Sequence, residues 1–370
     1  MWPFSGNGLR HSTVEYIPLF NPNASLQSVY PRNKQQWLYV VIALLSTMNV
    51  VLLGRAWYTY IPAPSLLDSY QILKPQFVVG RQDLVQPPRT DDESRAVVTS
   101  LYTDAFAYPV AALGHSLTAA DVTARKILMY LPNQVSLKAL CIAQAGGWQL
   151  HAVPLISPPT SSASGIGNRF GDQYTKLNLW TLDQIGVKAA VYLDADTIVR
   201  KKFDELWNLP YDFAAVPDVW ETARGFILGF NAGMLFLRPS NDTFTNMMNN
   251  LEHAVYPPHE AEQAFLNLYF GGEAVRLPYV YNANLAIKTR TKDFWKALQD
   301  DIRIVHYTTI KPFFYSGGIP TREKMQEEVD RSKTKRWGEY KEEVLWWEEA
   351  WHGVLENPEL EKCFEDDLSW

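Results

Sequence analysis

The 370-residue sequence has few cysteines, little excess charge and no internal repeat, and these shortages exclude several classes of protein. The two cysteines, Cys141 and Cys363, lie far apart and form neither a disulfide framework nor a CxxC metal pattern, so they leave the redox compartment open. The net charge of -6 gives no sign of a nucleic-acid partner. With 47% hydrophobic residues, the chain can form one large domain with extensions.

One long uncharged segment lies near the N-terminus. Between Lys34 and Arg55 there is no charged residue, and a helix of that length matches the ~20 residues needed to cross a bilayer. A buried core helix and a cleaved signal peptide are the alternatives, but the polar leader 1–36 is long for a signal peptide and no clear cleavage site follows. Aromatic residues suited to membrane interfaces flank the segment, namely Trp37, Tyr39, Trp57 and Tyr58. The segment therefore predicts a transmembrane anchor.

The charges around this segment favour one topology. Arg32 and Lys34 precede it and Arg55 follows, which favours a cytosolic N-terminus. We expect a single-pass type II membrane protein of the Golgi or another secretory-pathway membrane, with its main domain in the lumen. The sequon at Asn241 should then be accessible to glycan addition, whereas the sequon at Asn23 should stay unmodified.

The expected organisation has five parts: a cytosolic tail (1–36), a transmembrane signal-anchor (37–54), a stem (55–92), an α/β domain (93–320) and a charged helical C-terminal extension (321–370). Prolines and mixed polarity indicate little regular structure in the stem. In the extension, an apolar stripe at helical spacing comprises Val344, Trp347, Trp351 and Leu355. This stripe either packs back on the domain or binds a partner or membrane.

Short apolar runs alternate with helical patterns in the α/β domain. The predicted strands are 95–102, 125–132, 148–156, 188–196, 212–218, 231–239, 274–282 and 302–308. The predicted helices are 105–121, 136–146, 174–186, 241–255 and 260–271. This alternation predicts a largely parallel sheet covered on both faces, with ligands at the carboxyl ends of its strands.

Two aspartates end one of these strands. In "AAVYLDADT", Asp194 and Asp196 follow four apolar residues, and like charges so close repel unless a cation or reacting group lies between them. One interpretation is a divalent cation shared with the diphosphate of a nucleotide-sugar. A second is a haloacid-dehalogenase-type phosphatase, whose D-x-D-x-T motif is matched. A third is a helix cap formed by Asp196 and Thr197.

The position of the motif bears on the phosphatase interpretation. That motif belongs on the first strand of its domain, whereas about three predicted strands precede it here. A later acidic pair at a strand's carboxyl end is also missing, because Asp300 and Asp301 come before their strand. The phosphatase is thus a remote alternative.

Three further stretches agree better with a nucleotide-sugar. In "FNAGM", Asn231, Ala232 and Gly233 are small groups that would let a sugar approach the backbone. Glu262 and Gln263 begin an otherwise apolar helix, where they could cap it or bind sugar hydroxyls. In "HYTTIKPF", a strand ends in His306 and Lys311 follows in a turn; imidazole can bind Mn²⁺, and lysine can neutralise a diphosphate.

With these blocks together, the chain resembles family 8 glycosyltransferases, the group of glycogenin and galactinol synthase, from about Ala96 to Gly317. The blocks that carry the resemblance are "VTSLYTDAFAYPVAALGHSL", "YTKLNLWTL", "YLDADT", "FNAGM", "AEQAFLN" and "HYTTIKPF", in the family's order. The resemblance implies a GT-A fold, which is α/β with a Rossmann-like mixed sheet. It also implies a UDP-sugar donor, Mn²⁺ or another divalent cation, and retention of anomeric configuration.

The resemblance also implies a site, residue by residue. The metal ligands would be Asp194, Asp196 and His306. The donor would contact Thr99, Ser100, Tyr102, Arg169, Lys176, Asn231, Ala232 and Lys311, and the catalytic residues would be Glu262, Gln263 and Lys176. Arg169 lies in the Gly/Ser-rich stretch 157–174, which is either a lid over the phosphates or a surface insert.

Two departures from the family pattern and one missing residue qualify these expectations. Glu262 stands where glycogenin-like members have aspartate, and Phe313 stands where tryptophan is usual. Self-glucosylating members carry an acceptor tyrosine in the span that corresponds to 282–305, which here has none, although Thr289 or Thr291 could substitute. We therefore expect hexose transfer to a separate acceptor (glycan, lipid or protein), and a homodimer is possible. The alternative is a catalytically silent relative that binds nucleotide-sugar or acts as a scaffold.

Overall fold

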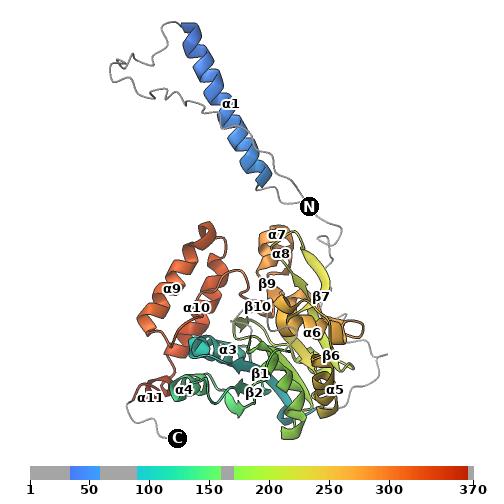
Figure 1. Ribbon diagram of the computed structural model, residues 1–370. Helices are drawn as coiled ribbons and strands as arrows, with labels where there is room; N and C mark the ends of the chain where they lie inside the picture. The colour runs from blue at the N-terminus through green and yellow to red at the C-terminus, as the bar shows by residue number, and fades with distance from the viewer. Residues whose placement is uncertain (1–33, 59–89, 160–170, 366–370) are drawn as a thin grey trace, which may run out of the picture. The chain divides into compact units, whose positions relative to one another are not determined.

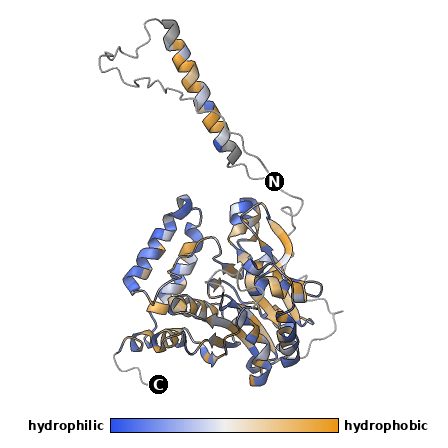
Figure 2. Cartoon of the chain, viewed as in Figure 1, coloured by the Kyte–Doolittle hydropathy of each residue, from blue (hydrophilic) through white to orange (hydrophobic). Residues whose placement is uncertain are grey.

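The computed structural model describes residues 34–58, 90–159 and 171–365 and divides the chain into two units, Met1–Ile61 and Pro62–Trp370. The described part of the first unit is one helix, α1 (Lys34–Tyr58). Its stretch Trp37–Arg55 has a mean hydropathy of 2.0, and much of the helix carries the hydrophobic colour in Figure 2. None of the stretch is buried within the structure. This helix is long and apolar enough to cross a membrane, as the sequence predicts.

The second unit is built on a seven-stranded sheet with the order β3-β2-β1-β4-β7-β6-β8 (Figure 1). Its strands are β1 (Arg95–Leu101), β2 (Arg125–Tyr130), β3 (Gln149–Ala152), β4 (Ala189–Leu193), β6 (Phe213–Val219), β7 (Phe226–Leu237) and β8 (Val275–Arg276). β1 to β4 are parallel, and β7 runs antiparallel to both β4 and β6. The predicted α/β class with a mixed, Rossmann-like sheet is confirmed.

Helices lie on both faces of this sheet. The α-helices described in the second unit are α3 (Ala107–Ala119), α4 (Leu137–Ala145), α5 (Asn241–Leu251), α6 (Ala261–Phe270), α7 (Ala286–Arg290), α8 (Lys292–Leu298), α9 (Arg322–Thr334), α10 (Lys341–Leu355) and α11 (Glu359–Lys362). Shorter 3-10 segments are η2 (Asp92–Ser94), η3 (Asp104–Phe106), η7 (Asp204–Asn208), η8 (Pro258–Glu260), η9 (Tyr279–Tyr281) and η10 (Lys335–Gly338).

Two predicted elements differ in kind from the structure. The predicted helix 174–186 is a 3-10 segment, η6 (Gln173–Ile185), in which the Asn178 amide donates to the backbone oxygens of Thr175 and Pro154. Such side-chain bonds compete with regular helix bonding. The predicted strand 274–282 shortens to β8, because Pro278 lacks an N–H for a sheet ladder and η9 follows.

Alternate residues of the strands face two separate hydrophobic cores. In β1, Val97 and Leu101 join the core formed with α3, α4 and α10, whereas Ala96 and Val98 join the core formed with η6, α5 and α6. This period of two is what a strand buried on both faces requires. The carboxyl ends of the strands remain between the two helical layers, where a site can form.

The C-terminal extension packs back on the domain through α10. Trp347 and Trp351 of the predicted apolar stripe are fully buried, and Trp351 meets Tyr108 of α3 edge to face at 4.8 Å between ring centroids. Of the two open interpretations, packing on the domain is confirmed. Phe313, one of the two departures from the family pattern, also lies here, buried against Phe106 and Trp347.

A disulfide ties the end of the extension to α4. Cys141 and Cys363 are bonded, with their Cα atoms 5.5 Å apart although 222 residues separate them in sequence. The spacing of the two cysteines predicts neither a disulfide framework nor a CxxC metal pattern, and the bond between them corrects the expectation of no disulfide. Because the two cysteines are far apart in sequence, their contact depends on how α10 and α11 pack on the domain, which local sequence patterns do not predict.

A second, three-stranded sheet brings the metal-binding candidates together. It has the order β5-β10-β9, with β5 (Thr197–Val199), β9 (Ala283–Asn284) and β10 (Ile304–His306). β5 was not predicted; it starts directly after Asp196, so the helix-cap interpretation is wrong. In the antiparallel register His306 lies opposite Thr197, and the Tyr307 N–H donates to the Asp196 carbonyl at 3.0 Å.

Candidate active site

The aspartate motif lies at the carboxyl edge of β4. Asp194 follows the last residue of that strand, and its N–H donates to the Gly233 carbonyl of β7 at 2.9 Å. The Thr197 hydroxyl closes the turn by donating to the Asp194 carbonyl at 2.8 Å. The turn thus holds both aspartates between β4 and β5.

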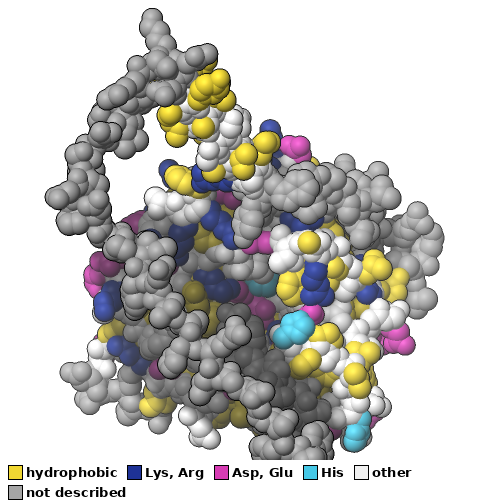
Figure 3. All heavy atoms as spheres, turned by 45° about the horizontal axis from the view of Figure 1, so that its top comes forward, with side chains coloured by type: hydrophobic (Ala, Val, Ile, Leu, Met, Phe, Trp, Pro, Cys, Tyr) yellow, Lys and Arg dark blue, Asp and Glu magenta, His cyan; other side chains and the backbone are white. Residues whose placement is uncertain are grey.

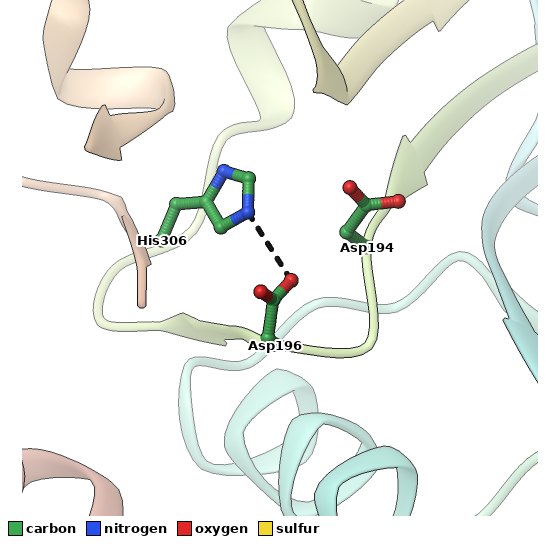
Figure 4. A group of neighbouring side chains, drawn as sticks. All are labelled: Asp194, Asp196 and His306. Carbon is green, nitrogen blue, oxygen red and sulfur yellow. Dashed lines mark ion pairs between the residues drawn. The ribbon is translucent and has the colours of Figure 1, made fainter. Parts of the chain in front are cut away.

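Asp194, Asp196 and His306 form one group, which we call the metal cluster (Figure 4). Each offers a ligand atom, and these atoms lie within 4.8 Å of one another. His306 Nε2 is 3.1 Å from Asp196 Oδ1, and Lys311 forms an ion pair with the other oxygen of Asp196. The sequence-predicted metal ligands are thus brought together from β4, β5 and β10.

A chain of amides assigns the proton on the His306 ring. Asn231 Oδ1 accepts from the Gly233 N–H at 2.9 Å and from Asn282 Nδ2 at 3.0 Å. The remaining atom of the Asn282 amide, Oδ1, lies 3.0 Å from His306 Nδ1, so this nitrogen must carry the proton. In neutral His306, Nε2 then directs a lone pair at Asp196. Two acceptors facing each other at this distance need a proton or a cation between them.

This arrangement fits a divalent cation. Two carboxylates and an imidazole are a hard oxygen and nitrogen donor set, of the kind that Mn²⁺ accepts. Gly233 is required for it, because a Cβ there would stand 2.2 Å from His306 Cε1. Burial would raise the pKa of Asp196, but Lys311 and His306 together lower it far below its ordinary value, so this ligand is ionised.

A buried lysine joins the metal cluster to the predicted catalytic carboxylate. Lys176 Nζ lies 3.1 Å from Asp194 Oδ1 and 2.7 Å from Glu262 Oε1, and it donates to the Ala232 carbonyl at 3.2 Å. Burial disfavours its charge, but the two carboxylates outweigh this and raise the pKa of Lys176 above its ordinary value. The lysine therefore stays charged between them.

Asp218, which the sequence analysis did not select, organises two other predicted residues. Asp218 Oδ1 accepts from the Val219 N–H at 2.8 Å and from Asn231 Nδ2 at 3.1 Å, and Oδ2 accepts from Gln263 Nε2 at 3.1 Å. Burial raises the pKa of Asp218. The signal was present: Asp218, like Asp194, follows a run of apolar residues in a buried strand.

The predicted donor-binding residues of β1 are bonded to β4. The Thr99 hydroxyl donates to the Leu193 carbonyl at 2.7 Å, and Ser100 Oγ lies 2.9 Å from the Tyr192 hydroxyl. That hydroxyl donates to Asp194 Oδ1 at 2.8 Å, so Ser100 is linked to the metal cluster through Tyr192. Tyr102 is buried next to them. Arg169 lies outside the described residues.

A pocket of about 220 Å³ opens beside these groups. Its buried floor includes Glu262 and Ala261, and Asp194 and Gln263 also line it. Other lining residues, His259 and Trp220 among them, are more exposed and mark its mouth. Figure 3 shows Lys and Arg side chains beside Asp, Glu and His side chains near the middle of the viewed face, as ion-paired groups around a site require.

The sequence from residue 170 to 316 matches the profile described as Glycosyl transferase family 8. The chain carries a family 8 glycosyltransferase domain. The matched range contains the metal cluster, Lys176, Asp218 and Glu262. The family predicted from the sequence blocks is therefore confirmed.

Several curated proteins are similar to the chain outside this profile as well. Glycogenin-1 of Caenorhabditis elegans is 29% identical over 63% of the chain and 54% of its own length. Galactinol synthase 1 of Ajuga reptans is 28% identical over 55% of the chain and 68% of its own length. The chain spans only 29% of the glycogenin of Neurospora crassa. The chain is thus similar to proteins that are named for different activities.

Solved structures resemble the chain more distantly. A crystal structure of the galactosyltransferase LgtC in complex with donor and acceptor sugar analogues has a TM-score of 0.43 and 19% sequence identity. The superposed region covers 67% of this chain and 99% of the LgtC chain. The fold class of the family 8 domain therefore rests on the strand order and directions given above.

Proposed function

We propose that the chain is a metal-dependent, retaining glycosyltransferase that moves a hexose from a UDP-sugar to a separate acceptor. The observation that carries this proposal is the metal cluster at the carboxyl edge of β4, inside a family 8 domain, with a lysine against each of its aspartates. Two aspartates, two lysines and a histidine gathered at a strand end are the side chains that would bind a divalent cation and a diphosphate.

At the metal cluster, side chains of the protein would offset the negative charge that develops on the departing diphosphate. Asp194, Asp196 and His306 would bind Mn²⁺ or another divalent cation, which supplies a Lewis acid for the donor diphosphate when bound. Lys311 lies in a turn after β10 and pairs with Asp196. Its ammonium group is therefore next to the metal cluster, where it would neutralise charge on phosphate oxygens. Thr99, Ser100 and Tyr102 form the adjacent edge of β1, where we place the uridine.

At the sugar end, Lys176 and Glu262 lie beside the same pocket. Lys176 bonds Asp194 and Glu262 and holds the Glu262 carboxylate toward the pocket that Asp194 also lines. Retention of configuration requires stabilisation of positive charge on the sugar carbon, and we assign this role to Glu262 because its carboxylate lines the pocket. Gln263 lines the pocket, and its Oε1 accepts from the Ala232 N–H at 2.9 Å. Asp218 accepts from both the Gln263 and the Asn231 side-chain amides and so holds these two residues together.

The test of this function is donor turnover by the purified full chain in detergent. With Mn²⁺ and a panel of UDP-hexoses, UDP should be released from at least one donor, and a chelator should stop the release. A silent nucleotide-sugar-binding relative would bind UDP without releasing it from any donor. Failure of both binding and release would refute the proposal.

We propose a lumenal location, in the Golgi or another secretory-pathway membrane. The apolar helix α1, the disulfide between Cys141 and Cys363, and the exposed Asn241 at the start of α5 support it, because disulfides persist in oxidising compartments. In sealed microsomes the domain should resist protease and Asn241 should be open to glycan addition. Digestion of the domain without detergent would place it on the cytosolic side.

We also propose that the acceptor is another molecule. Thr289, the alternative to the missing tyrosine, donates to Glu221 Oε1 at 3.1 Å and is bonded to the Tyr340 hydroxyl, so its hydroxyl is engaged in packing. After incubation with UDP-glucose and Mn²⁺, the intact mass of the chain should stay constant. A ladder of hexose additions would show self-transfer instead.

A further inference from the structure

We propose that Trp220, Arg224 and Glu260, which we call the mouth cluster, form an acceptor subsite for a neutral, hydroxyl-rich ring such as a sugar. This inference rests on the proposed glycosyl transfer and adds the class of acceptor. Trp220 and Glu260 line the same pocket as Asp194, Glu262 and Gln263. A ring held by them would therefore share one cavity with the group being transferred.

The mouth cluster is organised before any ligand binds. The Arg224 guanidinium lies 4.4 Å from the centre of the Trp220 ring, and its Nη1 donates to Glu260 Oε1 at 2.7 Å. Stacking on the aromatic face and the ion pair hold all three side chains together, although half of the Arg224 side chain remains exposed. A preformed polar and aromatic wall binds with less loss of side-chain entropy.

The backbone that carries Trp220 and Arg224 is also fixed. The Trp220 N–H donates to the Gly225 carbonyl at 2.9 Å, which closes the turn between β6 and β7. Gly225 has a φ of +59°, and a Cβ there would stand 2.8 Å from the Arg290 guanidinium. Arg290 in turn donates to the Thr222 carbonyl at 2.8 Å. These contacts therefore fix the backbone of the turn that carries Trp220 and Arg224.

In the segment that carries Glu260, a residue with a strained backbone, Ala261, separates Glu260 from Glu262. Ala261 has φ +49° and ψ −135°, a conformation that is sterically disfavoured for a residue with a Cβ and is kept mainly at functional sites. It lies between Glu260, which pairs with Arg224, and Glu262, which pairs with Lys176. The unusual backbone thus sends consecutive carboxylates to two different cations around one pocket.

The chemistry of the mouth cluster indicates a neutral ring. Arg224 and Glu260 neutralise each other, so the wall offers donors and acceptors without a net charge to attract an ion. Hydroxyl groups can use both, because each donates one hydrogen bond and accepts others. The Trp220 ring supplies a flat apolar surface for the C–H face of such a ring. His259 stands exposed at the same opening and can add a further polar contact.

The test separates acceptor binding from donor binding. The full chain in detergent is assayed with Mn²⁺, its best UDP-hexose, and glucose, galactose, mannose, maltose and glucuronate as acceptors, together with a Ser/Thr peptide. We expect neutral sugars to be accepted and Trp220→Ala to raise their KM about 10-fold, the ~1.4 kcal/mol scale of one aromatic contact. The Kd of UDP should change less than about 3-fold.

Two further variants control for misfolding and for general effects of the substitution. Trp220→Phe keeps a flat ring and should recover most of the acceptor affinity. Trp346→Ala removes another tryptophan stacked by an arginine, Arg200 at 3.8 Å from the ring centre, but outside the pocket lining, and should leave the acceptor KM unchanged.

The outcomes distinguish this inference from the proposed function. Donor turnover with an unchanged acceptor KM in Trp220→Ala, a preference for glucuronate, or acceptance of the peptide alone would overturn the mouth cluster as a sugar subsite while glycosyl transfer stands. Absence of UDP release from every donor in the wild-type chain would remove both.

Discussion

The metal cluster and the mouth cluster lie at one pocket but are built differently. The metal cluster draws two aspartates from the turn between β4 and β5 and a histidine from the end of β10, more than a hundred positions later, and a chain of amides behind the histidine starts at the Gly233 N–H. The mouth cluster comes from one turn and the start of one helix, and its arginine is half exposed. The difference teaches that a more enclosed, hydrogen-bonded end suits groups that must keep a fixed geometry, whereas a more accessible end can vary between proteins that share a fold.

The largest expected effect is at the metal cluster. Asp196→Asn removes a charge that Lys311 and His306 hold in place, and we expect transfer to fall at least ~100-fold, the scale seen when one preorganised charge-stabilising group is lost. The measurement is the rate of transfer and the binding of Mn²⁺. Asp330→Asn, which affects an exposed aspartate paired with Lys333, is the matched control. Unchanged transfer in Asp196→Asn, or in the wild-type chain with chelator, would contradict a metal role.

The next effect separates the two glutamates on either side of Ala261. Glu262→Gln removes the buried carboxylate beside Lys176, so turnover should fall by up to about 100-fold while UDP-sugar binding remains. Glu260→Gln at the mouth should act mainly on the acceptor KM. Steady-state kinetics with donor and acceptor varied separately make the comparison. If both variants change the same parameter, the division of the pocket into two ends is wrong.

A smaller effect is expected from the amide chain behind His306. Asn282→Ala removes the acceptor for His306 Nδ1–H, and loss of such an orienting partner typically weakens a metal by ~10- to 100-fold. Binding of Mn²⁺ without donor, followed by electron paramagnetic resonance, measures it. Asn282→Asp keeps the acceptor for His306 but loses the donor to Asn231 Oδ1, so it should recover only part of the affinity that Asn282→Ala loses. Equal affinity in Asn282→Ala and the wild-type chain would show that the ring needs no such partner.

The smallest effect tests the strain at the mouth. Glycine adopts the backbone conformation of Ala261 without steric cost, so Ala261→Gly should not lower the melting temperature. Ala264→Gly, three positions further into α6, should cost about 1 kcal/mol, as glycine does inside a helix. Thermal unfolding of both variants gives the difference. A loss in Ala261→Gly as large as that in Ala264→Gly would remove the argument from strain.

Much of the fold could be predicted because its signals are local. The apolar runs of β1 and β4, the Ser136 cap of α4, and the glycine at position 186 that ends η6 depend on neighbouring residues, and each is present in the structure. The helix type of η6 and the length of β8 differed, because Asn178 bonds across the chain and Pro278 ends the ladder. Local patterns thus place elements but determine their details less well.

The sequence by itself determined which residues could carry the chemistry. It put Asp194 and Asp196 at a strand end, His306 and Lys311 around another, and the family blocks in order, because polar residues after apolar strands stand out in the pattern. Only the tertiary structure decided their partners: Lys176 between two carboxylates, Asn231 and Asn282 behind His306, and Cys141 joined to Cys363. The physical reason is that these contacts depend on sheet order and helix packing, which bring together residues that no local periodicity relates.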